Sequence, residues 1–204
     1  NLKKRDLSLF TGFDKSVAYF ECISGIDIKQ FEAIIENPEV SAVLIGGYDG
    51  GNMPIQLKYY IATAVNSYNK PIVFVSHSDN GVADITVSGR IGEFVKSGAI
   101  ALGDMIKESA YQKLCFAMGI AKSNNIPTQE RMSFIRKIMH TNFTGEISDY
   151  FCSEGDKVYK DIFLSKQFTT EEIDKMIQKS AEDVSVMKVP VSVIEKKIKE
   201  VVKK

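Results

Sequence analysis

The sequence Ser-Ala-Val-Leu-Ile-Gly-Gly-Tyr-Asp-Gly-Gly-Asn-Met-Pro, at residues 41–54, decides the fold. Its first five residues, apolar after the serine, have the length of one strand, and a glycine-rich loop follows at residues 46–52. Beyond the loop, apolar side chains recur on one face of a predicted helix, which Asn52 can cap and whose first turn holds Pro54. A strand, a loop and a helix in this order form one unit of a parallel α/β sheet.

The same unit recurs in the first half of the chain. Short apolar runs at residues 17–23, 72–75 and 99–102 are predicted strands, and amphipathic helices are predicted between them. We therefore predict an α/β fold with a small four-stranded parallel sheet and flanking helices, in a flavodoxin-like three-layer arrangement.

The rest of the chain is predicted to be largely helical. Residues 105–118 are amphipathic, and a second helix opens at residues 126–128; both should cover the sheet. After Tyr150 the composition changes: residues 155–167 are mixed, and amphipathic segments follow at residues 170–180 and 191–203. We interpret residues 151–204 as a helical C-terminal extension that docks on the body of the chain or on another chain.

Composition excludes several classes of protein. The chain has 204 residues, 44% of them apolar, and 26 basic residues balance 26 acidic ones, so it lacks the positive charge that non-specific nucleic-acid binding requires. Its apolar runs are far shorter than the roughly 20 residues of a membrane span, and no secretory signal is visible. The odd number of cysteines, three, favours reduced thiols and a cytoplasmic location. Because the chain begins with Asn1, we expect that residues precede it in a larger protein.

Three loops are expected to share one rim of the sheet. They lie at residues 46–52, 76–84 and 103–105, after successive strands, and ligands of open parallel sheets bind at this end. The glycine-rich loop offers backbone N–H groups that suit a carboxylate or a phosphate. The alternative, which the glycines alone favour, is a turn that needs positive φ angles and leads into a capped helix.

No self-sufficient catalytic group of residues is visible. Ser76, His77 and Asp79 contain the residue types of a hydrolase triad, but neighbours along a strand end point to opposite faces, so we reject that interpretation. His140 lies at a predicted helix end with no zinc-ligand type one turn away, and no cysteine pair has zinc-site spacing. We expect no metal site and no cofactor.

Several segments in order resemble the C-terminal domain of L-asparaginases. Residues 43–54 resemble that family's "GxGxGNxP" loop, residues 71–76 its "PVVVxSQC" strand, and residues 97–105 its "AGAIxGGDM" segment. Residues 110–114 are similar to "AAYVKL", and residues 24–27 to the turn that opens the domain. Residues 135–147 resemble the "IRKxM…TNxxGEL" ending of the cytoplasmic, type I enzymes and of the related D subunit of the glutamyl-tRNA(Gln) amidotransferase.

The resemblance implies an amidohydrolase that converts asparagine to aspartate and ammonia with a threonine nucleophile. In the family that nucleophile belongs to a larger N-terminal domain, whose "TGGT" and "TDT" motifs are absent here, so we expect no catalytic residue in this chain and no activity from it alone. Members form dimers or tetramers in which the smaller domain helps to close a neighbour's site. The resemblance places Asn52, with Gly50 and Gly51, at the substrate.

The resemblance also divides the chain. Residues 1–16 match an interdomain linker and residues 17–150 the C-terminal α/β domain. Ser76, His77 and Ser78 replace the family's "SQC", whose cysteine type I enzymes place near a regulatory asparagine site, and they are a candidate effector site.

Three functions are therefore open. The first is the C-terminal domain of an asparaginase-like amidohydrolase, with an amide substrate, an N-terminal catalytic domain and a homodimer or homotetramer as partners. The second is the D subunit of the tRNA-dependent amidotransferase, which supplies ammonia to a tRNA-acting partner. The third is a non-catalytic binding or assembly module. None of them requires this chain to contact nucleic acid or a membrane.

Overall fold

The computed structural model describes residues 10, 12–78, 80–84, 89–159 and 166–183. They contain a four-stranded parallel sheet with strands β1 (Val17–Glu21), β2 (Ala42–Gly47), β3 (Ile72–Ser76) and β4 (Ile100–Ala101), in the order β1-β2-β3-β4. The predicted α/β class and the four strands are confirmed. The fourth strand is shorter than its apolar run at residues 99–102, although the Leu102 N–H still donates to the Phe74 carbonyl of β3 at 3.0 Å.

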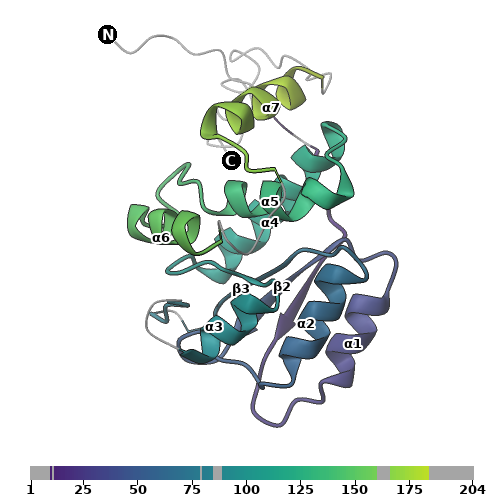
Figure 1. Ribbon diagram of the computed structural model, residues 1–204, viewed down its shortest axis with the longest axis vertical. Coiled ribbons are helices and arrows are strands. Elements are labelled where there is room, and N and C mark those ends of the chain that lie inside the picture. Colours follow the sequence, from purple (N-terminus) through teal and green to yellow (C-terminus); the bar gives the residue numbers. More distant parts are fainter. Residues whose placement is uncertain (1–9, 11, 79, 85–88, 160–165, 184–204) are drawn as a thin grey trace, which may run out of the picture.

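Three helices connect the strands and lie side by side (Figure 1): α1 (Lys29–Glu36), α2 (Leu57–Asn66) and α3 (Gly89–Lys96). Helix α1 packs on α2, and α2 packs on α3. Because the strands are in sequence order and crossovers between parallel strands are right-handed, all three helices lie on one face of the sheet. The strand order therefore never reverses, unlike the 2-1-3-4-5 order of flavodoxin-like sheets.

The opposite face belongs to one long helix. Helix α4 (Lys107–Ser123) contacts β1, β2 and β3, which completes the three layers. Helix α5 (Thr128–Met139) packs chiefly on α4. Our expectation that both helices cover the sheet therefore holds mainly for α4, and α5 adds a further layer outside it.

The core lies between these layers. Every residue of β2 and β3 is buried, as expected of central parallel strands that are covered on both faces. On α4, the buried residues include Ala110, Leu114 and Ala117, the stripe expected from the sequence.

The chain before β1 lies along α4. Phe10 and Phe13 pack against Phe116 of α4, with ring centroids 5.4 and 5.8 Å from it, and the N–H of Asp14 donates to the Cys115 carbonyl at 3.0 Å. We call residues 12–16 the arm. It crosses α4 at a glycine, Gly119, where a side chain would collide with the Gly12 carbonyl.

Two further helices are described after α5, α6 (Asp149–Tyr159), which begins two residues before the predicted extension, and α7 (Thr170–Asp183). Helix α7 was expected, but α6 was missed: we had interpreted residues 155–167 as mixed, and the helix covers the first five of them. The fully buried Ile173 of α7 faces the body, and α7 packs on α4. The predicted helix at residues 191–203 lies outside the described residues.

Side chains close the outer edge of β4. Tyr159 of α6 accepts a hydrogen bond from the Ala101 N–H at 2.6 Å, and its hydroxyl donates to the Ala99 carbonyl at 3.3 Å. Nε2 of the buried His140 donates to the Ala101 carbonyl at 2.9 Å. His140 is thus part of the sheet edge, and the described residues contain no group of three His, Cys, Asp or Glu side chains that could hold a metal ion.

The start of helix α2 and the apolar character of the helices both bear on what was expected of the function. Helix α2 begins five residues after Asn52, and its N-cap residue is Gln56, so the expected cap by Asn52 is wrong. Among the helices described, none has the length and apolar character that crossing a membrane requires.

Candidate functional site

The glycine-rich loop after β2 forms a tight hairpin at the C-terminal rim of the sheet. Tyr48 and Asn52 exchange two backbone hydrogen bonds, at 2.8 and 2.9 Å, so their N–H groups are already used. Between them, Asp49 and Gly51 have positive φ angles of 52° and 86°. The turn interpretation of this loop is therefore supported, and two of its N–H groups, those of Tyr48 and Asn52, are bonded within the hairpin.

Three glycines of the hairpin lie so close to other backbone and side-chain atoms that a side chain would have little or no room. A Cβ at Gly47 would lie 2.6 Å from the backbone of Gly51, and one at Gly51 would lie 2.9 Å from the Ala83 Cβ. A Cβ at Gly50 would lie 3.3 Å from the carbonyl oxygen of Val82. The predicted substrate-binding loop is thus packed against the segment that follows β3.

Asn52 is half-buried at the base of this hairpin. Within the residues that the structure describes, its side-chain amide makes no hydrogen bond, whereas its backbone is fixed by Tyr48. The hairpin therefore fixes the Asn52 backbone and leaves the donors and the acceptor of its side-chain amide unused. Asn52, Gly50 and Gly51 do not line the two rim cavities described below.

The loop after β3 is fastened to the glycine hairpin. The buried Ser76 hydroxyl donates to the Asp49 carbonyl and accepts a hydrogen bond from the Ser78 N–H at 3.1 Å. The His77 N–H donates to the Gly47 carbonyl at 2.7 Å. Ser76 is therefore a structural tie between the two loops, and its hydroxyl does not point to His77 as a catalytic triad would require.

The His77 ring instead meets a carboxylate from β1. Its Nδ1 lies 3.3 Å from Oε1 of Glu21, whose Oε2 accepts a hydrogen bond from the Tyr19 hydroxyl at 2.8 Å. Hydrogen bonds from Tyr19 and then from His77 lower the pKa of Glu21. Burial, followed by the hydrogen bond to Glu21, raises the pKa of the Tyr19 phenol. Glu21 is thus held as a carboxylate between a phenol and an imidazole.

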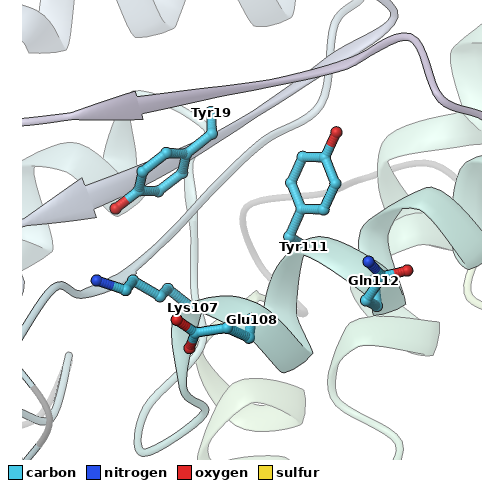
Figure 2. A pocket seen from close by; sticks show the side chains of 5 residues that line it. All are labelled: Tyr19, Lys107, Glu108, Tyr111 and Gln112. Carbon is cyan, nitrogen blue, oxygen red and sulfur yellow. The ribbon is translucent and has the colours of Figure 1, made fainter.

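Two adjoining cavities open beside this group. One, of about 260 Å³, is lined by all three candidate effector residues, Ser76, His77 and Ser78, together with the start of α4. The other, of about 380 Å³, lies between the rings of Tyr19 and Tyr111 (Figure 2). Lys107 and Glu108 line both cavities, so the two adjoin at the start of α4, and we call them together the groove.

The groove combines groups of both charges with apolar walls. Lys107 and Glu108 contribute opposite charges, and the serine and histidine side chains of the β3 loop line the polar end. Such a lining suits a small molecule that carries both an ammonium and a carboxylate group. In the groove, the Ser76 hydroxyl is bonded to the Asp49 carbonyl and the Ser78 N–H.

Sequence reasoning missed the contributions of β1 and α4. Tyr19 and Glu21 are two residues apart on a strand, so their side chains lie on the same face of the sheet. Both side chains end in a polar group, whereas the rest of the run is apolar. That spacing was the available signal. A side chain at Gly46 would collide with the Tyr19 hydroxyl, so the glycine after the β2 run accommodates this tyrosine.

The chain is similar in sequence to two kinds of known protein. No family model matches the chain. An L-asparaginase from Thermococcus kodakarensis is 25% identical over 136 residues, which are 66% of this chain and 38% of the relative. The D subunit of the glutamyl-tRNA(Gln) amidotransferase from Methanosphaera stadtmanae is 27% identical over 144 residues, 71% of this chain and 31% of the relative. The chain is a homologue of these two kinds of protein.

Solved structures agree on the fold of this asparaginase homologue. The thermostable L-asparaginase from Thermococcus kodakarensis superimposes with a TM-score of 0.56 at 25% identity, over 67% of this chain and 39% of that one. L-asparaginase I from Vibrio cholerae shares the fold, with a TM-score of 0.54 at 19% identity, over 65% of this chain and 38% of that one. The chain thus spans only a little over a third of the length of the asparaginases it matches.

Proposed function

We propose that this chain is the C-terminal domain of an L-asparaginase-like amidohydrolase, in which a preceding N-terminal domain supplies the threonine nucleophile. The observation that carries the proposal is the match to L-asparaginases, which covers two thirds of this chain but little more than a third of theirs. The polar and charged side chains that line the rim cavity support this role.

In this proposal Asn52 contacts the amide substrate across a boundary between domains or subunits. The hairpin fixes the Asn52 backbone, and its amide is unused by other described residues, as a group reserved for a ligand should be. Gly50 and Gly51 keep the hairpin compact, so that a substrate or a neighbouring domain can approach it. The assembly would be a homodimer or a homotetramer in the cytoplasm, where its three free cysteines would stay reduced.

The test uses the protein that includes the sequence upstream of Asn1. Asn52→Ala should raise KM or lower kcat for asparagine hydrolysis by an amount equivalent to on the order of 1.5–3 kcal/mol, the cost of one hydrogen bond to a charged ligand group. Asn66→Ala, an exposed asparagine at the end of α2, is the matched control and should leave both constants unchanged. Unaltered kinetics in a folded Asn52→Ala protein would refute the role of Asn52.

The isolated chain provides a second test. It should release no ammonia from asparagine or glutamine, because covalent catalysis needs a nucleophile and its base in one molecule. Ammonia release that persists through a further purification step would contradict the proposed division of labour.

The D subunit of the tRNA-dependent amidotransferase is the second candidate, since its sequence from Methanosphaera stadtmanae matches 71% of this chain at 27% identity. The two candidates differ in dependence on a partner. An asparaginase hydrolyses free asparagine alone, whereas the amidotransferase component would need its tRNA-acting partner for full activity. Measuring ammonia release with and without candidate partner proteins separates them.

We also propose that Ser76, His77 and Ser78 form the polar end of an effector site. All three line the 260 Å³ cavity, and Lys107 and Glu108 supply the charges that an amino acid requires. In calorimetric titration with asparagine, Ser78→Val should weaken binding at this site and leave the fold intact. Equal affinity in the variant would remove Ser78 from the site.

A further inference from the structure

A further cavity lies at the edge of the sheet where the strands begin, opposite the rim that carries the groove. The arm and the turn before β2 meet there, and the Ser41 N–H donates to the Ser16 carbonyl at 2.8 Å. Helix α4 ends at this edge, and α5 begins there. The volume of the cavity is about 460 Å³, within the range of small-molecule sites. We call it the edge cavity.

Two carboxylates line the edge cavity from the arm and from the turn before β2. They belong to the half-buried Asp14 and the exposed Glu39. The Ser16 N–H and hydroxyl both donate to Oδ1 of Asp14, the N–H at 2.9 Å. Burial opposes ionisation of Asp14, but the hydrogen bonds from Ser16 lower its pKa. Asp14 is therefore held in place as a carboxylate beside the cavity.

Two cations line the same cavity from the helices. Lys122 lies in the last turn of α4, and the half-buried Arg131 lies in α5. Within the part of the chain that the structure describes, neither side chain forms an ion pair or a hydrogen bond, although Lys122 is near enough to Asp14 to help lower its pKa. The cations and the carboxylates of the edge cavity thus do not pair with one another.

The rest of the lining is apolar, apart from Ser16 and Ser41. Met118 and Ala121 of α4 are only 4% and 3% exposed, and Pro38 completes the set. A ligand in the edge cavity therefore meets carboxylates from the strand side, cations from the helices and an apolar surface. A simple anion would face the two carboxylates, and a simple cation would face Lys122 and Arg131, whereas a ligand with both charges complements all four groups.

We propose that the edge cavity binds a free α-amino acid with an apolar side chain. The ammonium group of the ligand pairs with Asp14 and Glu39. Its carboxylate pairs with Lys122 and with Arg131, whose planar guanidinium suits a carboxylate. Its side chain packs on the apolar part of the lining. This site goes beyond the proposed function, because the edge cavity shares no lining residue with the groove.

Calorimetric titration of the full chain with L-leucine tests the ligand class. Two analogues are matched controls: N-acetyl-L-leucine lacks the ammonium group, and L-leucinamide lacks the carboxylate. Each should bind at least about tenfold more weakly, because each loses hydrogen bonds between charged groups. Glycine should also bind more weakly, because it has no side chain to bury. No heat with millimolar L-leucine, or equal affinity for either analogue, would overturn the proposal.

Variants test the location of the site. Arg131→Gln and Asp14→Asn should each weaken L-leucine binding at least about tenfold. Arg90→Gln, at an exposed arginine of α3, is the control and should leave the affinity unchanged. Lys122→Gln, at an exposed helix position, keeps the test decisive if Asp14→Asn folds poorly, and it should also weaken binding. L-leucine binding that persists at native affinity in Arg131→Gln or Lys122→Gln would assign the ligand to another site and overturn the proposal.

Discussion

Nζ of Lys113, inside α4, lies 2.5 Å from Oε1 of Glu146, in the turn after α5, and their side chains are only 6% and 10% exposed. Lys113 also donates to the carbonyls of Met139 and Thr141, at 3.1 and 2.6 Å. Glu146 accepts hydrogen bonds from the N–H groups of Phe143 and Thr144. The pair therefore fastens the turn at residues 141–146 to the helix that covers the sheet.

Replacing one partner of this pair should destabilise the fold strongly. Lys113→Met leaves the Glu146 carboxylate nearly buried without its cation, and breaking a buried pair in this way costs about 3–5 kcal/mol. Urea unfolding followed by circular dichroism measures the loss. The exposed pair of Lys96 and Glu93 is the control, and Lys96→Met should cost far less. Similar losses for both variants would show that the buried pair of Lys113 and Glu146 stabilises the fold no more than an exposed pair does.

Acid should remove the contribution that Glu146 makes to the stability of the fold. Burial opposes ionisation, but the hydrogen bond from Lys113 and those from backbone N–H groups lower the pKa of Glu146 to about 2. A carboxyl whose pKa is lower in the folded state than its unfolded value of about 4.3 stabilises the fold fully above that value. Its contribution is lost as the pH falls from about 4 towards 2. The difference in unfolding free energy between the native chain and Glu146→Gln should therefore shrink across that interval, and a difference that stays constant with pH would contradict this assignment.

The hydroxyl of Tyr159 should protect the edge of the sheet. Tyr159→Phe keeps the buried ring but leaves the Ala101 N–H without the oxygen that lies 2.6 Å away, and an unsatisfied buried donor costs about 1–3 kcal/mol. Amide hydrogen exchange at Ala101 should accelerate in the variant. Tyr150→Phe, at an exposed tyrosine of the same helix, should leave exchange at Ala101 unaltered. If Ala101 exchanges at the same rate in both variants, the edge does not depend on this hydroxyl.

Local patterns predicted the layers of the fold because those patterns record burial. The run at residues 42–45 is apolar at consecutive positions, as central parallel strands are, and the stripe of Ala110, Leu114 and Ala117 repeats at helical spacing. Helix α6 was missed because Gly155 interrupts its pattern. That glycine packs against the His140 ring, a contact between residues distant in sequence.

The candidate site was predicted only as far as loops on one rim. Ser76, His77 and Ser78 do line a cavity there, but Glu21 and Lys107 reach the rim from other elements, and no local spacing connects them. The burial of one lysine was also not predictable from the local sequence. Lys70 looks like a solvated lysine in sequence, yet its Nζ donates to the carbonyls of Ile35 and Asn37 at the end of α1, each at 2.6 Å.

Gly119 tests how firmly the arm holds α4. In a helix interior, Gly→Ala normally stabilises by about 1 kcal/mol, because alanine restricts the unfolded chain and favours the helix. Here the added Cβ would collide with the Gly12 carbonyl, so Gly119→Ala must displace either the arm or the helix. We expect a net loss of about 1–3 kcal/mol, the usual cost of overpacking, measured by urea unfolding. In a chain that lacks residues 1–13 the obstacle is gone, and the same substitution should become neutral or stabilising. The sign of the Gly119→Ala effect should thus reverse between the two backgrounds. A loss of the same size in both would mean that the arm does not lie against α4 in solution.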